Sequence, residues 1–434
     1  MARLPTGVAY LDRPTEDPGD LPAAAPEGPD RALPLPAPVE VLRGRPERQG
    51  AQPRSAPAPQ TPGAPRVQDI PRRLPRPDAA AAPAPLAGLG PRAAEALAWL
   101  DAMVLSSRPF AERWAAFWHD LLLPPDPEAA RLGLAGAFHR EVIRPLAFAP
   151  YGALLEAAYR HPAQTRALDA HAAPETAGAI LLDAHTVGPA AGDVRDRREA
   201  GLALSGWRAR RPGEPSVGGF RFDETLHAPG ARRVLGDVHP AAGEGQGRAL
   251  LQTLSARPET ARHLAGRIAR HFLADAPDAR AVETIADAWR ASRGDLAHVA
   301  RTLVALPALW ARPFAKLRSP RDLAVAALRG LSARPDAETL RAIEEMGQPV
   351  HGGGDLGGAD DLADAWAAPG RLPARLAFCL RTARAHAGRA DPDLLLRALL
   401  GPAATGASAR LVAEAPGRPE ALALLLASPE FNRR

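Results

Sequence analysis

Residues 14–91 contain 20 of the 48 prolines of the chain, and no aromatic residue lies between Tyr10 and Trp99. A segment so rich in proline and so poor in large apolar side chains cannot bury enough surface to offset the entropy lost on ordering. Stretches such as ALPLPAPVE and APAPQTPGAP are typical of an extended linker. We therefore expect residues 1–90 to form a disordered Pro/Ala-rich arm, and the folded body to span 91–434.

The bulk composition is that of a globular protein. Hydrophobic residues make up 46% of the 434 residues and aromatic residues only 5%, so the core must consist mostly of alanine, leucine and valine. The net charge of +5 comes almost entirely from arginine, because Lys316 is the only lysine. These arginines are mixed with acidic residues, whereas a nucleic-acid binder concentrates positive charge on one face. We expect no nucleic-acid partner.

The single cysteine and the first residues bear on redox chemistry and location. Cys379 lies in the apolar helical context RLAFCLRTA, which predicts a small buried hydrophobe and not a nucleophile. No window approaches the ~18 apolar residues that a membrane-spanning helix requires. The first twenty residues contain no apolar signal-peptide region, which predicts a cytoplasmic location for the chain as written. Export stays open if the true start lies upstream.

After residue 91 the apolar residues recur with a helical period. Over 109–122 they form one stripe, consisting of Phe110, Trp114, Phe117, Trp118 and Leu121. Asp193 is a plausible N-cap, and Ser319 followed by Pro320 is a clear helix start. The same pattern predicts helices over 134–146, 151–160, 175–187, 193–205, 246–256, 258–274, 279–292, 295–306, from 319 onward, and over 372–388, 392–400, 407–414 and 418–428.

One region breaks the helical pattern. Phe220 and Phe222 alternate, Pro229-Gly230 is a turn signal, and the following RRVLG is able to pair back, which predicts one short β-hairpin. MGQPVHGGGDLGGADD reads as a glycine-rich loop, without the spacing or the preceding strand of a phosphate loop. We predict an all-α, multi-helix body with this hairpin, and a sub-boundary near 210–245 is an option.

Seven motifs occur in an order that resembles a known family. They are RPFAERWAAFWHD, FHREVIRPLAFAPYGALLEAAYRHPA, ETAGAILLDAHTVG, GLALSGW, FRFDETLHAPGARRVLG, WARPFAKLRSPRDLAVAALRGL and MGQPVHGGGDLG. Over roughly residues 90–431 the chain resembles the bacterial domain-of-unknown-function 1800 family. The resemblance implies a mostly helical protein without an established activity or catalytic residues. It also implies a partner in the domain-of-unknown-function 1501 family, whose genes often lie beside it.

The chain departs from the family pattern in one motif. Where family members carry Asn-Glu-Asn-Tyr-Ala-Arg-Glu-Leu-Met-Glu-Leu-His-Thr-Leu-Gly, this chain retains Glu175, His185, Thr186 and Gly188 but replaces the Arg-Glu pair with Ala179-Ile180. If that pair belongs to a site, this chain is a divergent member that has lost part of it.

Five polar residues form the candidate polar site: His119, Asp120, Asp183, His185 and His227. His119 points away from the apolar stripe of its helix and lies in the last turn. One interpretation is a surface histidine at the negative end of the helix dipole, and the other is an imidazole facing a polar pocket. Histidine and aspartate side chains from several helices could also converge as metal ligands, but no spacing requires it, so no metal site is assigned.

A second set of residues is a candidate for binding anions: Arg140, Arg144, His263, Arg267 and His271. Three of them form a row at i, i+4 and i+8 beside the apolar row of one helix. The alternative is intramolecular pairing, with Glu244 or Asp275 as partners of this row and with Glu141 as the helical partner of Arg144.

No catalytic signature is present, and no cofactor is indicated. We therefore expect a binding or assembly role without catalysis. The alternative is a hydrolase or metal-dependent enzyme that uses His119, His185 and His227.

Overall fold

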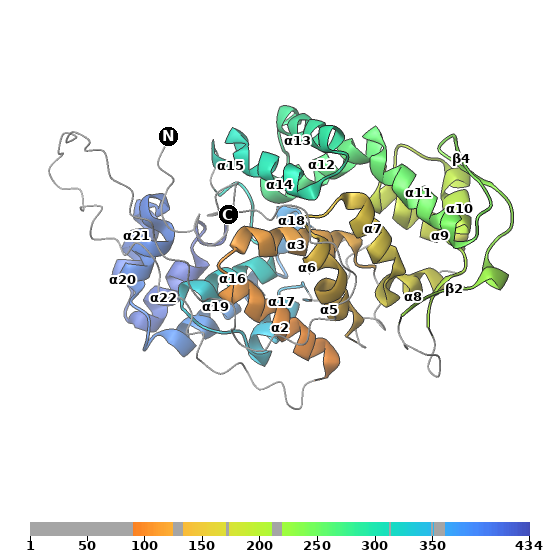
Figure 1. Ribbon diagram of the computed structural model, residues 1–434. Coiled ribbons are helices and arrows are strands. Elements are labelled where there is room, and N and C mark those ends of the chain that lie inside the picture. Colours follow the sequence, from red (N-terminus) through yellow and green to blue (C-terminus); the bar gives the residue numbers. More distant parts are fainter. Residues whose placement is uncertain are drawn as a thin grey trace, which may run out of the picture.

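The computed structural model describes residues 90–124, 133–170, 173–210, 219–311, 314–348, 350 and 361–434. Residues 1–89 of the proposed arm over 1–90, and residues 351–360 of the glycine-rich loop, lie outside these residues. Helices dominate the described part of the chain, which confirms the predicted all-α class (Figure 1). No helix in it is long and apolar enough to cross a membrane.

The part of the body that the structure describes up to Ala203 is built from helical segments. They are α2 (Pro91–Leu105), α3 (Pro109–Leu122), α5 (Leu134–Phe138), the π-helix η3 (His139–Ile143), α6 (Arg144–Leu146), α7 (Tyr151–Arg160), α8 (Pro162–Ala170), α9 (Pro174–Ala179), the π-helix η4 (Ile180–His185) and α10 (Val194–Ala203). The side chain of Asp193 accepts hydrogen bonds from the backbone of Arg195 and Asp196, so its predicted role as the N-cap of α10 is confirmed.

Among the described residues, four short strands precede the second group of helices. β1 (Trp207–Ala209) pairs with β2 (Phe220–Phe222), and β3 (Arg232–Val234) pairs with β4 (Asp237–His239), both antiparallel. A 3-10 turn, η5 (Glu224–Leu226), separates the two sheets. The helices that follow are α11 (Glu244–Ala256), α12 (Pro258–Phe272), α13 (Ala279–Ser292), α14 (Leu296–Ala305) and α15 (Pro307–Ala311).

The predicted pairing within this region was wrong. Phe220 and Phe222 do not pair with the RRVLG segment but with the strand that begins at Trp207. The aromatic ring of Phe220 packs edge-on against the buried Trp207, with ring centroids 5.2 Å apart. The partner strand was missed because three residues following a helix are too few to show an alternating pattern.

The C-terminal part is helical again. Its elements are α16 (Pro320–Gly330), α17 (Ala337–Glu345), α18 (Ala363–Ala367), α19 (Leu372–His386), α20 (Pro392–Leu395), the π-helix η6 (Leu396–Leu400), the 3-10 helix η7 (Gly401–Ala403), α21 (Gly406–Ala413) and α22 (Arg418–Ala427). Ser319 caps α16 by accepting from the backbone N–H of Asp322, as predicted. Cys379 is buried, also as predicted, and burial raises the pKa of its thiol to about 12.

Buried side chains form two cores. The first core draws on residues between Phe110 and Leu309, and the second core draws on α2 and on residues from Leu323 to Phe431. In Figure 1 the helices of the second core occupy one end of the molecule and the strands the other, with α3 between them. Trp207 and Leu250, on either side of the sub-boundary considered near 210–245, belong to the same core.

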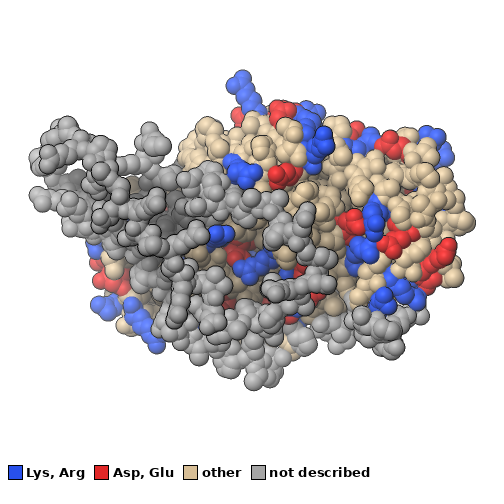
Figure 2. All heavy atoms as spheres, in the orientation of Figure 1, with Lys and Arg blue, Asp and Glu red and all other residues tan. Residues whose placement is uncertain are grey.

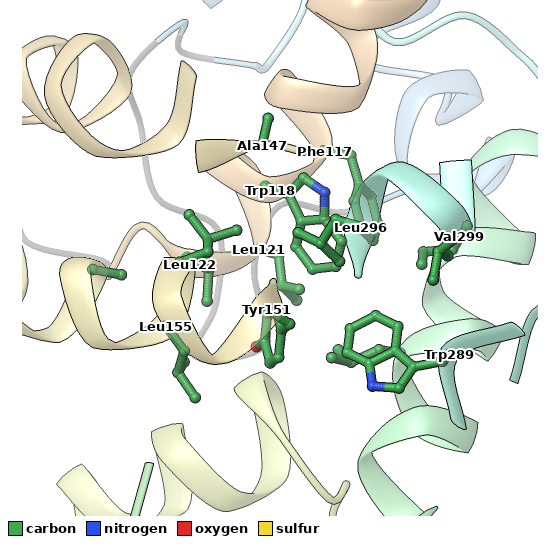
Figure 3. Packing of buried hydrophobic residues seen from close by; sticks show 14 of the residues in the cluster. Phe117, Trp118, Leu121, Leu122, Ala147, Tyr151, Leu155, Trp289, Leu296 and Val299 are labelled. Atoms are coloured by element: carbon green, nitrogen blue, oxygen red, sulfur yellow. The ribbon is translucent and has the colours of Figure 1, made fainter. Parts of the chain in front are cut away.

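Helix α3 supplies the aromatic centre of the first core. Trp114 and Trp118 are fully buried, and the indole N–H of Trp114 donates to the backbone oxygen of Ala147 at 2.7 Å. Figure 3 shows Trp118 and Leu121 of α3 facing Tyr151 and Trp289. The neighbouring Ala116 contributes to the second core, so the two cores meet along α3.

Helices α9 and α10 cross closely because each presents a glycine to the other. A Cβ atom on Gly178 would lie 1.7 Å from the carbonyl oxygen of Arg197, and one on Gly201 would lie 1.9 Å from that of Pro174. Gly178→Ala and Gly201→Ala should each lower the free energy of unfolding by about 1–3 kcal/mol, because the backbones must separate. Urea denaturation measures this.

The matched control is Gly266→Ala in α12, where nothing lies within 4 Å of the added methyl group. That change should raise the stability by about 0.5–1 kcal/mol, the helix-propensity difference. Equal effects at all three positions would contradict the close crossing.

Candidate functional site

The structure buries His119, so the interpretation as a surface histidine was wrong. The side chain is 1% exposed and lies against Trp99 and His139, with ring centroids 4.7 and 5.2 Å away. The helical-wheel prediction that His119 points away from the apolar stripe still holds, because α2 and η3 cover that second face. Burial, with the nearby charge of Arg321, lowers the pKa of His119 to about 3, so the imidazole is neutral at pH 7.

Asp120 points in a different direction, toward α16. Its two carboxylate oxygens accept from Arg321 Nη1 at 3.0 Å and Nη2 at 2.5 Å, a bidentate ion pair. The guanidinium of Arg321 also stacks over the ring of Trp99, 4.7 Å from its centroid. Asp120 therefore joins α3 to α16.

Asp183 and His185 lie on η4, each with partners of its own. Arg197 Nε donates to both carboxylate oxygens of Asp183, at 2.9 and 3.2 Å. His185 Nδ1 lies 2.9 Å from the hydroxyl of Tyr159, and the backbone of Leu121 is a further hydrogen-bond partner of the ring. Burial and the charge of Arg267 lower the pKa of His185 to about 3.

His227 lies beside the first sheet. Its Nδ1 is 2.9 Å from the backbone oxygen of Ser205, and the ring packs against Phe222 at 5.3 Å. Each of the five candidate polar residues thus has a separate set of partners. Among the described residues, no group of three or more histidine, cysteine, aspartate or glutamate side chains is arranged to hold a metal ion.

Two of the candidate anion-binding residues are engaged in ion pairs. Arg140 contacts Glu95 and Glu141, and Arg144 Nη2 donates to Glu112 Oε1 at 2.6 Å. The prediction of a helical pair between Glu141 and Arg144 was therefore wrong, because the π-helical turn η3 and the neighbouring helices bring other partners closer.

The row on α12 divides between two environments. His263 Nε2 lies 3.4 Å from the backbone oxygen of Ala184, whereas Arg267 and His271 line a cavity. The predicted acidic partners of this row were wrong: Glu244 pairs with Arg160 and Arg248, and Asp275 pairs with Lys316. Instead, His271 Nδ1 lies 3.1 Å from Asp361 Oδ1.

The cavity lies where the two cores meet, and we call it the seam pocket. It encloses about 30 Å³, room for about two water molecules at ~10–15 Å³ each. Its wall consists of Phe117, Asp120 and Leu121 from α3, Arg267 and His271 from α12, Ser319 and Arg321 at the start of α16, and Gln348 and Asp361.

A buried charge network supports this wall. Lys316 is 1% exposed, and its Nζ lies 2.5 Å from Asp275 Oδ1 and 3.6 Å from Asp361 Oδ1. The side chain of Arg434 contacts Asp322 and lies 4.0 Å from Asp361 Oδ1. Sequence reasoning missed Lys316, Asp361 and Arg434. The signal that could have pointed to Lys316 is that it is the only lysine of the chain.

Opposite charges meet in the seam pocket, where two carboxylates and two guanidiniums line the same wall. Burial lowers the pKa of His271 to about 4, with Arg434 adding to the shift and Asp361 opposing it. Burial also lowers the pKa of Arg267, and Arg270 lowers it further. Burial alone would raise the pKa of Asp361, but His271, Lys316 and Arg267 outweigh it and hold the carboxyl ionised. At pH 7, His271 is therefore neutral and donates Nδ1–H to Asp361.

With this geometry in place, comparison with known proteins assigns the chain to a family. Residues 47–433 match the family model described as "Protein of unknown function (DUF1800)", which is most of the chain. The chain belongs to the DUF1800 family. The match begins within the proline-rich segment, upstream of the region that carries the motif resemblance. No curated protein and no solved structure matches the chain.

Proposed function

We propose that this DUF1800 protein has a binding or assembly role without catalysis. The observation that carries the proposal is that burial keeps the imidazoles of His119 and His185 neutral. Two of the three histidines suggested for catalysis, His119 and His185, have pKa values of about 3. Such imidazoles are weak proton acceptors at neutral pH, far from the value near 7 that suits a general base.

The surface supports a partner other than nucleic acid. Figure 2 shows basic and acidic side chains intermingled on the described part of this face. Many are paired with each other, as in Arg290 with Glu283 and Asp287. A member of the DUF1501 family is the partner that the family resemblance suggests.

One observation favours a catalytic alternative. His271 and Asp361 form a histidine–carboxylate pair at the wall of a cavity, the arrangement that orients an imidazole as a base. The low pKa of His271, about 4, weighs against it, because proton transfer to so weak a base is unfavourable at neutral pH.

Two measurements test the proposal on the purified full-length chain. Ester, phosphoester and peptide substrates should show no turnover above that of the His271→Phe variant, and size-exclusion chromatography with a DUF1501 protein should give a stable complex. Turnover that the His271→Phe change abolishes would establish the enzyme instead. A chain that stays alone with this partner would refute the assembly role.

A further inference from the structure

Helix α19 leaves a row of leucines exposed. Leu372 is 46% exposed and Leu376 is 56% exposed, and Leu380, one turn further along, is partly exposed. Positions four residues apart lie on one side of a helix, so these three leucines form a single row. Phe378 and Cys379 of the same helix are buried in the second core. Exposed apolar side chains that lie next to one another mark a site of interaction.

Positive charge continues this row toward the end of the helix. Residues 371–389 contain five arginines and no acidic residue. Arg384 follows Leu380 at the same four-residue spacing, and Arg389 comes shortly after the helix ends. Both arginines are exposed, and neither forms an ion pair within the part of the chain that the structure describes. The exposed face of α19 is therefore first apolar and then basic.

The N-terminal residues carry side chains in the complementary order. Residues 4–11, LPTGVAYL, are mostly apolar, and residues 12–20, DRPTEDPGD, contain four acidic residues against one arginine. Residues 31–76 contain nine arginines and only three acidic residues, so they do not complement a basic surface. Residues 4–20 thus match the face of α19 both in chemistry and in order.

The described chain begins close to α19. Arg92, at the start of α2, pairs with Glu344 near the end of α17, and the adjacent Glu345 pairs with Arg381 of α19. Residues 21–89 connect the acidic stretch to this point, and a coil of that length spans about 45 Å between its ends. The connection is long enough for the N-terminal residues to reach α19 of the same chain. Such a tether gives an effective concentration in the millimolar range, so a weak contact is sufficient.

We propose that residues 4–20 dock on the exposed face of α19 within the same chain. Residues 4–11 cover the row of leucines, and residues 12–20 pair with Arg384 and Arg389. Covering the leucines removes apolar surface from water, and the ion pairs fix the direction of the segment along the helix. The contact is internal to the chain, so it is independent of the proposed binding role.

Photo-crosslinking in the full-length chain tests this contact. A benzophenone amino acid is placed at Tyr10, and the same amino acid at Gln60 serves as the control. After irradiation at low protein concentration, the crosslink from position 10 in monomeric protein should map to α19, for example to the tryptic peptide LAFCLR (residues 376–381). The probe at position 60 should show no preference for α19. Absence of the α19 crosslink in the monomer would overturn the proposal, and α19 crosslinks confined to dimers would assign the segment to a second copy instead.

Charge reversal tests the ion pairs. Arg384→Glu combined with Arg389→Glu should reduce the yield of the α19 crosslink roughly tenfold at low salt, because exposed attractive pairs become repulsive. Adding Glu16→Arg and Asp17→Arg to that variant should restore the yield. Arg280 of α13 is also exposed and without an ion pair among the described residues, so Arg280→Glu should leave the yield unchanged. A yield that is insensitive to the reversal, or that the exchanged charges do not restore, would contradict the docking.

Discussion

Replacing Trp114 with alanine should lower the free energy of unfolding by about 3–5 kcal/mol, the range for truncating a large aromatic side chain in a core. Trp114 is fully buried and packs against Phe110, Phe117 and Phe272. The change leaves a cavity at the helix where the two cores meet. It also removes the donor to the carbonyl of Ala147, whose lost hydrogen bond costs roughly another 1 kcal/mol.

Trp310→Ala is the matched control. Its indole N–H also donates to a backbone carbonyl, that of Val304 at 2.9 Å, but the side chain is only partly buried. Guanidinium chloride unfolding should therefore show a clearly smaller loss, of about 1–2 kcal/mol. A Trp114 variant no less stable than the Trp310 variant would show that α3 does not hold the cores together.

The second large effect is expected at the ion pair between α3 and α16. Asp120→Asn keeps the size of the side chain but leaves the guanidinium of Arg321, itself 2% exposed, without its bidentate carboxylate. Removing one partner of a buried pair costs about 3–5 kcal/mol, because the remaining charge is desolvated and uncompensated. The 18% exposure of the Asp120 side chain places the expected loss at the lower end of that range.

Asp287→Asn makes the same substitution in an exposed ion pair with Arg290. Exposed pairs contribute about 0–1 kcal/mol, so this variant should be nearly as stable as the wild type. Denaturant midpoints of the two variants measure the difference directly. Comparable midpoints would mean that the seam between the cores is solvated and that its ion pairs are weak.

Local signals explain why most helices were predicted from the sequence. The apolar stripe of α3 and the caps Asp193 and Ser319 act within a few residues, and each appears in the structure where the pattern placed it. The strand pairing of Trp207 with Phe222 was not predictable in this way, because pairing depends on which segments the tertiary fold brings together. The burial of His119 was not predictable for the same reason, because the side chains that cover it, Trp99 and His139, come from other elements.

The candidate site was also predictable only within single elements, and its contacts between elements were not. The row of Arg267 and His271 was visible at helical spacing within one element. Their partners were not, since Asp361 lies 90 residues further along the chain from His271 and belongs to a different segment of the fold. Arg321 and Asp120 are separated by 201 residues. A sequence pattern identifies the face of a helix but not what that face meets.

The most direct test of the account is nitrogen NMR of the histidine rings across a pH titration of the full-length chain. The account predicts that His119, His185 and His271 stay neutral between pH 5 and 7. Protonation of these rings within that range would contradict the buried, neutral imidazoles on which the binding role without catalysis rests.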